Sequence, residues 1–227
     1  MVLSAKLLKR EIKTTPKDCL IIVDMQNDFM PGGALAVKGG DEIIEGCNQI
    51  ATKFHEKKLP VIFTQDWHPV SHQSFASQHP GKKPGDELEQ SSDKIGPILW
   101  PDHCVQGSRG ARFHPELKSE PAIAIIRKGY HEDIDSYSAF LEKDKKTTTG
   151  LDGFLNKLGV QRIFVCGLAM DYCVYYTLLD GNMLGFKGVF ILNLTRPVGD
   201  PEGRVKKIMK TFSEKKIALT NYETIIT

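Results

Sequence analysis

The sequence predicts an α/β fold of three layers, in which helices cover both faces of a mostly parallel, doubly wound, six-stranded sheet. Short apolar runs rich in β-branched residues alternate with helical patterns along the 227 residues. The runs are continuously apolar rather than alternating, which is typical of strands buried on both faces of a parallel sheet. Strands and helices that alternate in this way favour right-handed crossovers.

Each element can be assigned from its local pattern. The expected strands, in chain order, are 19–23, 61–64, 122–126, 162–166, 188–192 and a weaker one at 216–220. Helices are expected where apolar side chains recur with a helical period, or where a glycine ends the pattern. These are 41–57, 151–158, 172–184 and 202–215.

One stretch, from about 69 to 120, departs from this alternation. It is rich in Pro, Gly, His and Ser, has little periodicity and is much longer than an ordinary strand-to-helix loop. Such an insertion is either a flexible loop or a functional segment. Because nothing resembles an interdomain linker, residues 1–227 are expected to form a single domain that carries this insertion.

Composition excludes several classes of protein. The 30 basic and 28 acidic residues give a net charge of +2, without the basic excess expected of a nucleic-acid partner. No apolar run approaches the roughly 18 residues of a membrane span. The five cysteines are odd in number and form no CxxC pair, which favours a reducing compartment. Since residues 1–15 also lack the apolar core of a secretory signal, a cytoplasmic protein is expected. The number of subunits stays open.

Polar residues follow the strands at their carboxyl ends, where open parallel sheets bind ligands. Asp24 follows the first strand, Lys128 follows the third, and Cys173 lies at the start of the helix after the fourth. A thiol beside a cation and a helix N-terminus is expected to have a lowered pKa, and Asp24 can accept its proton. With the backbone amides of Ala169 and Cys173 as an oxyanion hole, this set suits acyl transfer.

Each of these residues also has a purely structural interpretation. A single cysteine is more often a small buried apolar residue. Asp24 alone can cap a turn, and Lys128 alone can be a solvated strand end. Their joint placement at one edge of the sheet favours catalysis over these alternatives.

A second set has the donor types of a metal site. Asp66 and His68, one residue apart at an extended strand end, point the same way, and His103 from the insertion completes three ligands. This set suits Zn²⁺, Fe²⁺ or Mn²⁺, and Ser74 can also approach such an ion, directly or through water. The alternative for the Asp–His pair is a loop salt bridge. Other histidines compete as ligands, namely His72, His79, His114 and His131.

Five blocks resemble the nicotinamidase branch of the isochorismatase-like cysteine hydrolases. They are IIVDMQNDFMPGGALAV, TQDWHP, WPDHCVQGS, RKGYHEDIDSYSAF and VCGLAMDYCVYYT, in order between Cys19 and about Leu192. The resemblance implies a parallel six-stranded sheet with the isochorismatase-like hydrolase fold, and a cis peptide between Leu168 and Ala169. It also implies hydrolysis of nicotinamide, and of pyrazinamide, to the acid and ammonia.

The resemblance implies roles for the same residues. Asp24, Lys128 and Cys173 become the catalytic triad. The implied metal ligands are Asp66, His68 and His103. They would hold a divalent metal, with Zn²⁺ the first choice, and this metal would bind the pyridine nitrogen of nicotinamide. The implied substrate pocket consists of Phe29, Leu35, Trp100, Tyr137 and Tyr172. The stretch 129–137 is longer and more acidic than in small bacterial members, so the pocket rim can differ there.

Three other functions stay open. A related amidohydrolase of carbamoyl or ureido substrates would use the same triad without needing the metal set. A catalytically dead scaffold would have lost one of the triad residues, and all three are present. A vinyl-ether hydrolase of the isochorismatase type would lack the nucleophilic cysteine.

Overall fold

The predicted parallel sheet is confirmed. A computed structural model of the protein describes residues 11–89, 91–199 and 203–227. In this part of the chain, the main sheet has the strand order β4-β3-β2-β5-β6-β7, and every neighbouring pair is parallel. Its strands are β2 (Asp18–Val23), β3 (Val61–Asp66), β4 (Ala124–Lys128), β5 (Arg162–Leu168), β6 (Lys187–Arg196) and β7 (Ala218–Thr220). Two short strands that were not expected, β1 (Ile12–Lys13) and β8 (Ile225–Ile226), form a separate parallel pair.

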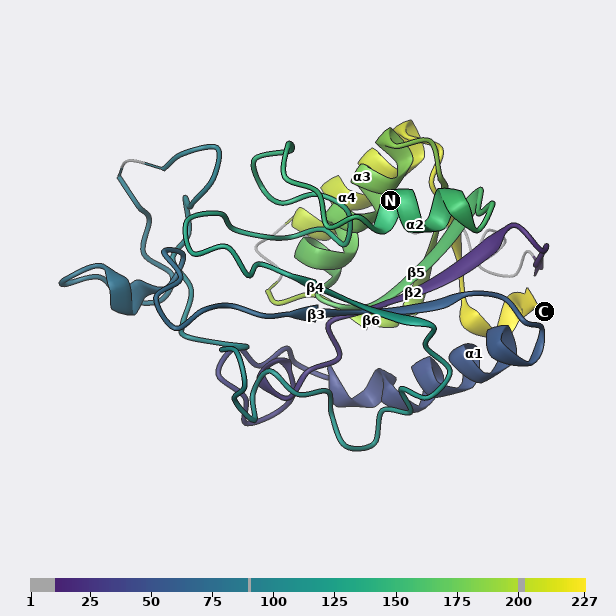
Figure 1. The fold of residues 1–227 in the computed structure, drawn as a ribbon, viewed down its shortest axis with the longest axis horizontal. Coiled ribbons are helices and arrows are strands. Elements are labelled where there is room, and N and C mark those ends of the chain that lie inside the picture. Colours follow the sequence, from purple (N-terminus) through teal and green to yellow (C-terminus); the bar gives the residue numbers. More distant parts are fainter. Residues whose placement is uncertain (1–10, 90, 200–202) are drawn as a thin grey trace.

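Helices cover both faces of this sheet, which gives the expected three layers (Figure 1). Helix α1 (Ile44–Glu56) lies on one face, after a 3₁₀ turn at Asp41–Ile43. The opposite face carries α2 (Leu151–Lys157), α3 (Tyr175–Met183) and α4 (Arg204–Glu214). The expected start of the last helix, at residue 202, lies outside the described residues, as does most of the N-terminal segment 1–15. Within the described ranges, no helix is both long and apolar enough to cross a membrane.

The continuous apolar runs are explained by two cores, one on each face of the sheet. Alternate residues of β2 point to opposite faces: Leu20 and Ile22 pack with α1, whereas Cys19 and Ile21 pack with the other helices. On the α1 side, Phe54 meets Phe164 with ring centroids 5.3 Å apart. Every residue of β2 and β3 is buried, so the apolar run within each strand packs against a core on both faces of the sheet.

The strand order creates a switch point between β2 and β5. From β2 the chain adds β3 and β4 on one side of the sheet, and it then places β5 on the other side of β2. Ligands bind at the carboxyl ends of strands beside such a point. Asp24 directly follows β2, and Ala169 directly follows β5.

The long insertion is held by backbone pairing at this edge of the sheet. Part of it extends beyond the carboxyl ends of β3 and β4, at the left of Figure 1, and part runs back along the α1 side of the sheet, where Asn48 Nδ2 donates to the Glu116 carbonyl at 2.8 Å. The Trp100 amide donates to the Ser74 carbonyl at 2.8 Å, and the His68 amide donates to the Cys104 carbonyl at 3.1 Å. Apart from a 3₁₀ turn at Ala76–Gln78, the described residues between 69 and 120 form irregular structure that brings distant residues to the strand ends.

The expected helix at 172–184 begins differently. Residues Met170–Val174 form a single π-helical turn, and α3 starts only at Tyr175. Cys173 therefore lies in the π turn rather than in the first turn of an α-helix. Single π turns are frequent at functional sites. Sequence periodicity gives no signal for them, because one such turn is too short to shift the apolar pattern.

Gly167 permits the close approach of β5 to β2. Its φ is +102°, and a Cβ there would overlap the backbone of Val23. We expect Gly167→Ala to lower the free energy of unfolding by at least about 2 kcal/mol, since the added methyl group forces the strands apart. Urea denaturation followed by circular dichroism measures this loss.

Gly153 provides the matched control for that substitution. It lies in α2, and a Cβ there would have no atom within 4 Å. Gly153→Ala should stabilise the protein by roughly 0.5 kcal/mol. Equal unfolding midpoints for the two variants would contradict the steric argument.

Candidate active site

A buried lysine is the centre of the site. Lys128, the last residue of β4, is fully buried. Its Nζ lies 2.9 Å from Asp24 Oδ2 and 3.3 Å from Cys173 Sγ, and it also contacts Asp66 Oδ1. A buried ammonium is tolerated only when opposite charges compensate it, and two carboxylates do so here. The structure thus brings the three predicted triad residues together.

Thr64 fixes the orientation of Asp24. Its hydroxyl accepts the Asp24 amide at 3.2 Å and donates to Asp24 Oδ1 at 2.5 Å. Asp24 itself adopts a left-handed φ of +46°, which turns the chain sharply after β2. Among the described residues, Oδ2 makes the ion pair with Lys128 but receives no hydrogen bond. One carboxylate oxygen is therefore held, and the other faces Lys128.

The expected lowering of the Cys173 pKa is wrong for the structure as it stands. Burial raises the pKa of this thiol well above its ordinary value, and the nearby Lys128 lowers it by less. Asp24 adds to the increase, and burial also raises the pKa of Asp24 itself. Although burial alone would lower the pKa of Lys128, Asp24 and Asp66 raise it well above the ordinary value. The resting thiol is thus protonated, and it needs a base in order to react.

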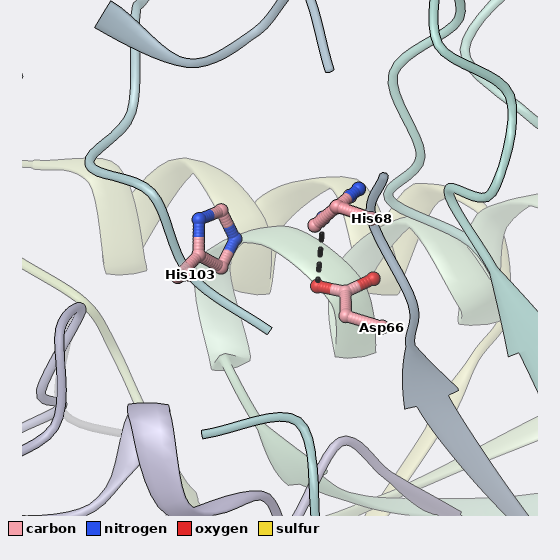
Figure 2. Close-up of side chains that lie close together, drawn as sticks. All are labelled: Asp66, His68 and His103. Atoms are coloured by element: carbon pink, nitrogen blue, oxygen red, sulfur yellow. Dashed lines mark ion pairs between the residues drawn. The ribbon is translucent and has the colours of Figure 1, made fainter. Parts of the chain in front are cut away.

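The predicted metal set also converges. Asp66, His68 and His103 each present a ligand atom within 4.8 Å of the others, and all three are buried. Figure 2 shows the Asp66 and His68 side chains facing one another, with His103 opposite them on a different segment of the chain. His68 Nε2 lies 3.7 Å from Asp66 Oδ2.

The imidazole nitrogens are oriented for metal binding. His68 Nδ1 lies 2.8 Å from the Gly129 carbonyl, and His103 Nδ1 lies 2.8 Å from the Pro101 carbonyl. A carbonyl only accepts, so both Nδ1 atoms carry a proton and Nε2 is the nitrogen of each ring left to bind a metal. Burial and the neighbouring His68 lower the pKa of His103 to about 4, which keeps this ring neutral. Although burial alone would lower the pKa of His68, Asp66 raises it, so a metal ion would have to displace a proton from His68 Nε2. Two imidazoles and a carboxylate are donors that fit a Zn²⁺, Fe²⁺ or Mn²⁺ ion.

Ser74 and His72 contact each other beside this group, and the role of Ser74 at the metal stays a prediction. The Ser74 hydroxyl lies 2.7 Å from His72 Nδ1, and His72 Nε2 lies 3.1 Å from the Ile134 carbonyl. The His72 ring packs against His68 with centroids 4.4 Å apart, so it supports a member of the set. Among the described residues, no group that could hold a metal ion includes His79, His114 or His131.

A glycine and a buried carboxylate support the backbone beside Lys128. Gly129 has a φ of +65°, and a Cβ there would overlap the His68 ring. Glu142 Oε1 accepts the Gly129 amide at 3.2 Å, while the Gly129 carbonyl meets His68. Sequence reasoning missed Glu142, because it has no distinguishing local pattern.

A cavity that opens to solvent is lined by Cys173 of the first set and by all three residues of the metal set. All five residues of the implied substrate pocket line it: Phe29, Leu35, Trp100, Tyr137 and Tyr172. Its lining also includes Ala169. Trp100 meets Tyr172 edge to face, with centroids 5.0 Å apart. The arrangement suits a flat aromatic ligand.

Three further residues of the lining were not foreseen: Asp135, Ser136 and Val198. Asp135 and Ser136 precede Tyr137 in a recognised block, so its acidic run was an available signal. Val198 follows β6 outside the recognised blocks, and no sequence signal pointed to it.

The predicted cis peptide between Leu168 and Ala169 is present. Ala169 directly precedes the π turn, and its carbonyl accepts the amides of Tyr172 and Val174 at 3.2 and 3.1 Å. Both predicted oxyanion-hole residues line the cavity. Their role in catalysis stays a prediction.

Comparisons with known proteins agree with this geometry. Residues 18–196 match the isochorismatase domain. A nicotinamidase from Acinetobacter baylyi is 44% identical over 85% of this chain and 87% of its own. A solved nicotinamidase and pyrazinamidase from Acinetobacter baumanii has a TM-score of 0.84 at 42% identity, covering 92% and 98% of the two chains. The structure of a Pyrococcus horikoshii pyrazinamidase in complex with zinc has a TM-score of 0.73 at 35% identity, covering 91% and 99%.

The charge balance around Lys128 can be tested without any substrate. Lys128→Met leaves Asp24 and Asp66 buried together without their cation. We expect the metal-free variant to lose roughly 3–5 kcal/mol of unfolding free energy in urea denaturation. Lys94→Met is the control, because it removes an exposed lysine paired with Asp133 at 3.0 Å and should leave the midpoint nearly unchanged. Similar losses of unfolding free energy in both variants would show that Lys128 does not balance the charges of Asp24 and Asp66.

Proposed function

The chain belongs to the isochorismatase family, and on this basis we propose that it is a metal-containing amidohydrolase that hydrolyses nicotinamide to nicotinic acid and ammonia, with pyrazinamide as a second substrate. One observation carries the proposal: a thiol that lines an aromatic-walled cavity contacts a buried ammonium, which is itself paired with a buried carboxylate. The nicotinamidase and pyrazinamidase relatives support the choice of substrate.

The first half of the reaction forms a thioester. The carboxamide carbon lies at Cys173 Sγ, and Asp24 takes the thiol proton as the sulfur attacks. The amides of Ala169 and Cys173 stabilise the oxyanion. Lys128 keeps its proton and offsets the negative charge that develops on sulfur. Asp24 then returns the proton to nitrogen, the C–N bond breaks and ammonia leaves.

The second half of the reaction releases the acid. Water attacks the thioester carbon while Asp24 accepts a proton from it, so a C–O bond forms and the C–S bond breaks. Cys173 leaves as a thiolate and recovers its proton from Asp24. The same carboxylate thus serves twice, which agrees with its raised pKa.

Asp66, His68 and His103 would hold a divalent ion, for which Zn²⁺ is the first choice and Fe²⁺ or Mn²⁺ the alternatives. When bound, such an ion supplies a Lewis acid for the pyridine nitrogen of the substrate. The zinc complex of the Pyrococcus horikoshii pyrazinamidase supports this choice. Phe29, Leu35, Trp100, Tyr137 and Tyr172 would enclose the pyridine ring.

We further propose that residues 1–227 form a single domain, with the insertion at about 69–120 supplying metal and substrate contacts. His103 and Trp100 from this insertion line the same cavity as Cys173. A cytoplasmic location is proposed from the cysteine usage alone. The metal set disfavours a carbamoyl or ureido substrate, and the cysteine disfavours a vinyl-ether substrate.

Cys173→Ala should abolish ammonia release from nicotinamide, by at least about a thousandfold, because no thioester can form. A coupled ammonia assay measures turnover, and calorimetry should show that nicotinamide still binds. Cys19→Ala, which truncates a buried cysteine in β2 away from the cavity, should keep its activity. Full activity of Cys173→Ala would refute the mechanism.

Removal of metal should abolish turnover, and addition of Zn²⁺, Fe²⁺ or Mn²⁺ should restore it. His103→Ala should bind less metal, as determined by elemental analysis, and should have a raised KM, because one ligand is lost. His55→Ala is the control, since His55 lies exposed on α1. Unchanged metal content in His103→Ala would show that another residue is the ligand.

A further inference from the structure

Asp135 is a buried carboxylate that lines the cavity but belongs to neither predicted set. It lies between β4 and α2, and 2% of its surface is exposed. Its backbone is held on both sides, since its amide donates to the Lys94 carbonyl at 2.9 Å and its carbonyl accepts the Lys143 amide at 2.8 Å. Among the described residues it forms no ion pair with Lys or Arg. A carboxylate buried in this way needs hydrogen-bond donors.

Two neighbours in sequence supply those donors. Asp135 Oδ1 accepts the Ser136 amide at 2.9 Å, and Oδ2 accepts the Tyr137 hydroxyl at 2.5 Å. The Tyr137 oxygen in turn accepts Trp100 Nε1–H at 2.8 Å. Asp135 thus ends a chain of hydrogen bonds that begins on the insertion and passes through two aromatic residues of the cavity wall.

This chain leaves neither aromatic side chain with a free donor. The indole of Trp100 has one N–H, which Tyr137 accepts, and Tyr137 has one O–H, which Asp135 accepts. Burial, together with Asp135, raises the pKa of Tyr137 well above its ordinary value, so the hydroxyl keeps its proton. Both rings also pack on Tyr172, with centroids 5.0 and 5.4 Å away. Trp100 and Tyr137 therefore offer aromatic surface and no free side-chain hydrogen-bond donor.

We propose that Asp135 is a positioning residue for substrate binding, because its carboxylate holds Tyr137 and Trp100 as a fixed wall that lacks free donors. A planar ring then binds to this wall by aromatic contact, and the polar groups of the substrate are recognised elsewhere in the cavity. The inference rests on the proposed function for its kinetic test. Asp135 acts through Tyr137 and does not touch the reacting atoms.

The chemistry of the two acceptor sites makes Asp135→Asn the informative substitution. Asparagine keeps the size of the side chain but has one acceptor oxygen for two donors, the Ser136 amide and the Tyr137 hydroxyl. Its NH₂ group must face one of them. We expect KM for nicotinamide to rise about tenfold, the equivalent of one lost hydrogen bond, with kcat within about threefold of the wild type and unchanged metal content.

A double-mutant cycle with Tyr137→Phe tests the connection. Removing the hydroxyl eliminates one of the two donors, so Asp135→Asn should cost little more in that background. Asp133→Asn is the control: it makes the same change of charge two residues away on an exposed side chain paired with Lys94, and its KM should match the wild type. Additive effects of Asp135→Asn and Tyr137→Phe on KM would overturn the proposal. A fall in kcat at unchanged KM, or a loss of metal, would also overturn it.

Tryptophan emission provides a readout that needs no catalysis. The chain has two tryptophans, and Trp67 is common to all variants, so differences in emission report Trp100. Asp135→Asn and Tyr137→Phe should both shift the emission maximum, while Asp133→Asn should not. Unshifted emission in folded Asp135→Asn would overturn the inference even if nicotinamide proved not to be the substrate. If Asp135→Asn does not fold, Tyr137→Phe must alone raise KM and preserve kcat, and failure to do so refutes the inference.

Discussion

The pairing of one buried ammonium with two buried carboxylates organises this molecule. Lys128 ends β4, Asp66 ends β3, and Asp24 directly follows β2, so three neighbouring strands each contribute one charge at the same edge of the sheet. Removing these charges from water is costly, and only their mutual contact offsets that cost. The three charged residues can therefore meet only if the three strands keep this register, and the register in turn fixes which residues form the site.

Asp66 joins the two halves of the site. It contacts Lys128 on one side and faces His68 and His103 on the other. Although burial alone would raise the pKa of Asp66, Lys128 and His68 lower it, so the group remains a carboxylate in both roles. The Asp66 carboxylate thus contacts the ammonium beside the thiol and also belongs to the set suited to a metal. Such sharing sets the separation between the Cys173 sulfur and the three residues suited to a metal.

The insertion supplies residues of the site that the sheet does not provide. Its backbone pairs with the segments that follow β3, and it brings Trp100 and His103 into the cavity. Trp100 is then tied through Tyr137 to Asp135, on the segment after β4. Loops carry the contacts to ligand while the parallel sheet supplies rigid ends, as is common in α/β proteins.

Local patterns in the sequence were enough to predict the six strands, the helices on both faces and the polar residues at the strand ends, because continuous apolar runs and their boundaries are properties of neighbouring residues. The thiol pKa, the π turn at Cys173, and the parts played by Asp135, Glu142 and Val198 depend instead on burial and on contacts between segments distant in the chain. Burial raises the pKa of Cys173 by more than the nearby ammonium lowers it, and the amino-acid composition cannot reveal which effect is larger. The sequence by itself determined which chemical groups stand at the edge of the sheet; only the tertiary structure decided their charge, their orientation and the residues that hold them, since desolvation and hydrogen bonding act through space.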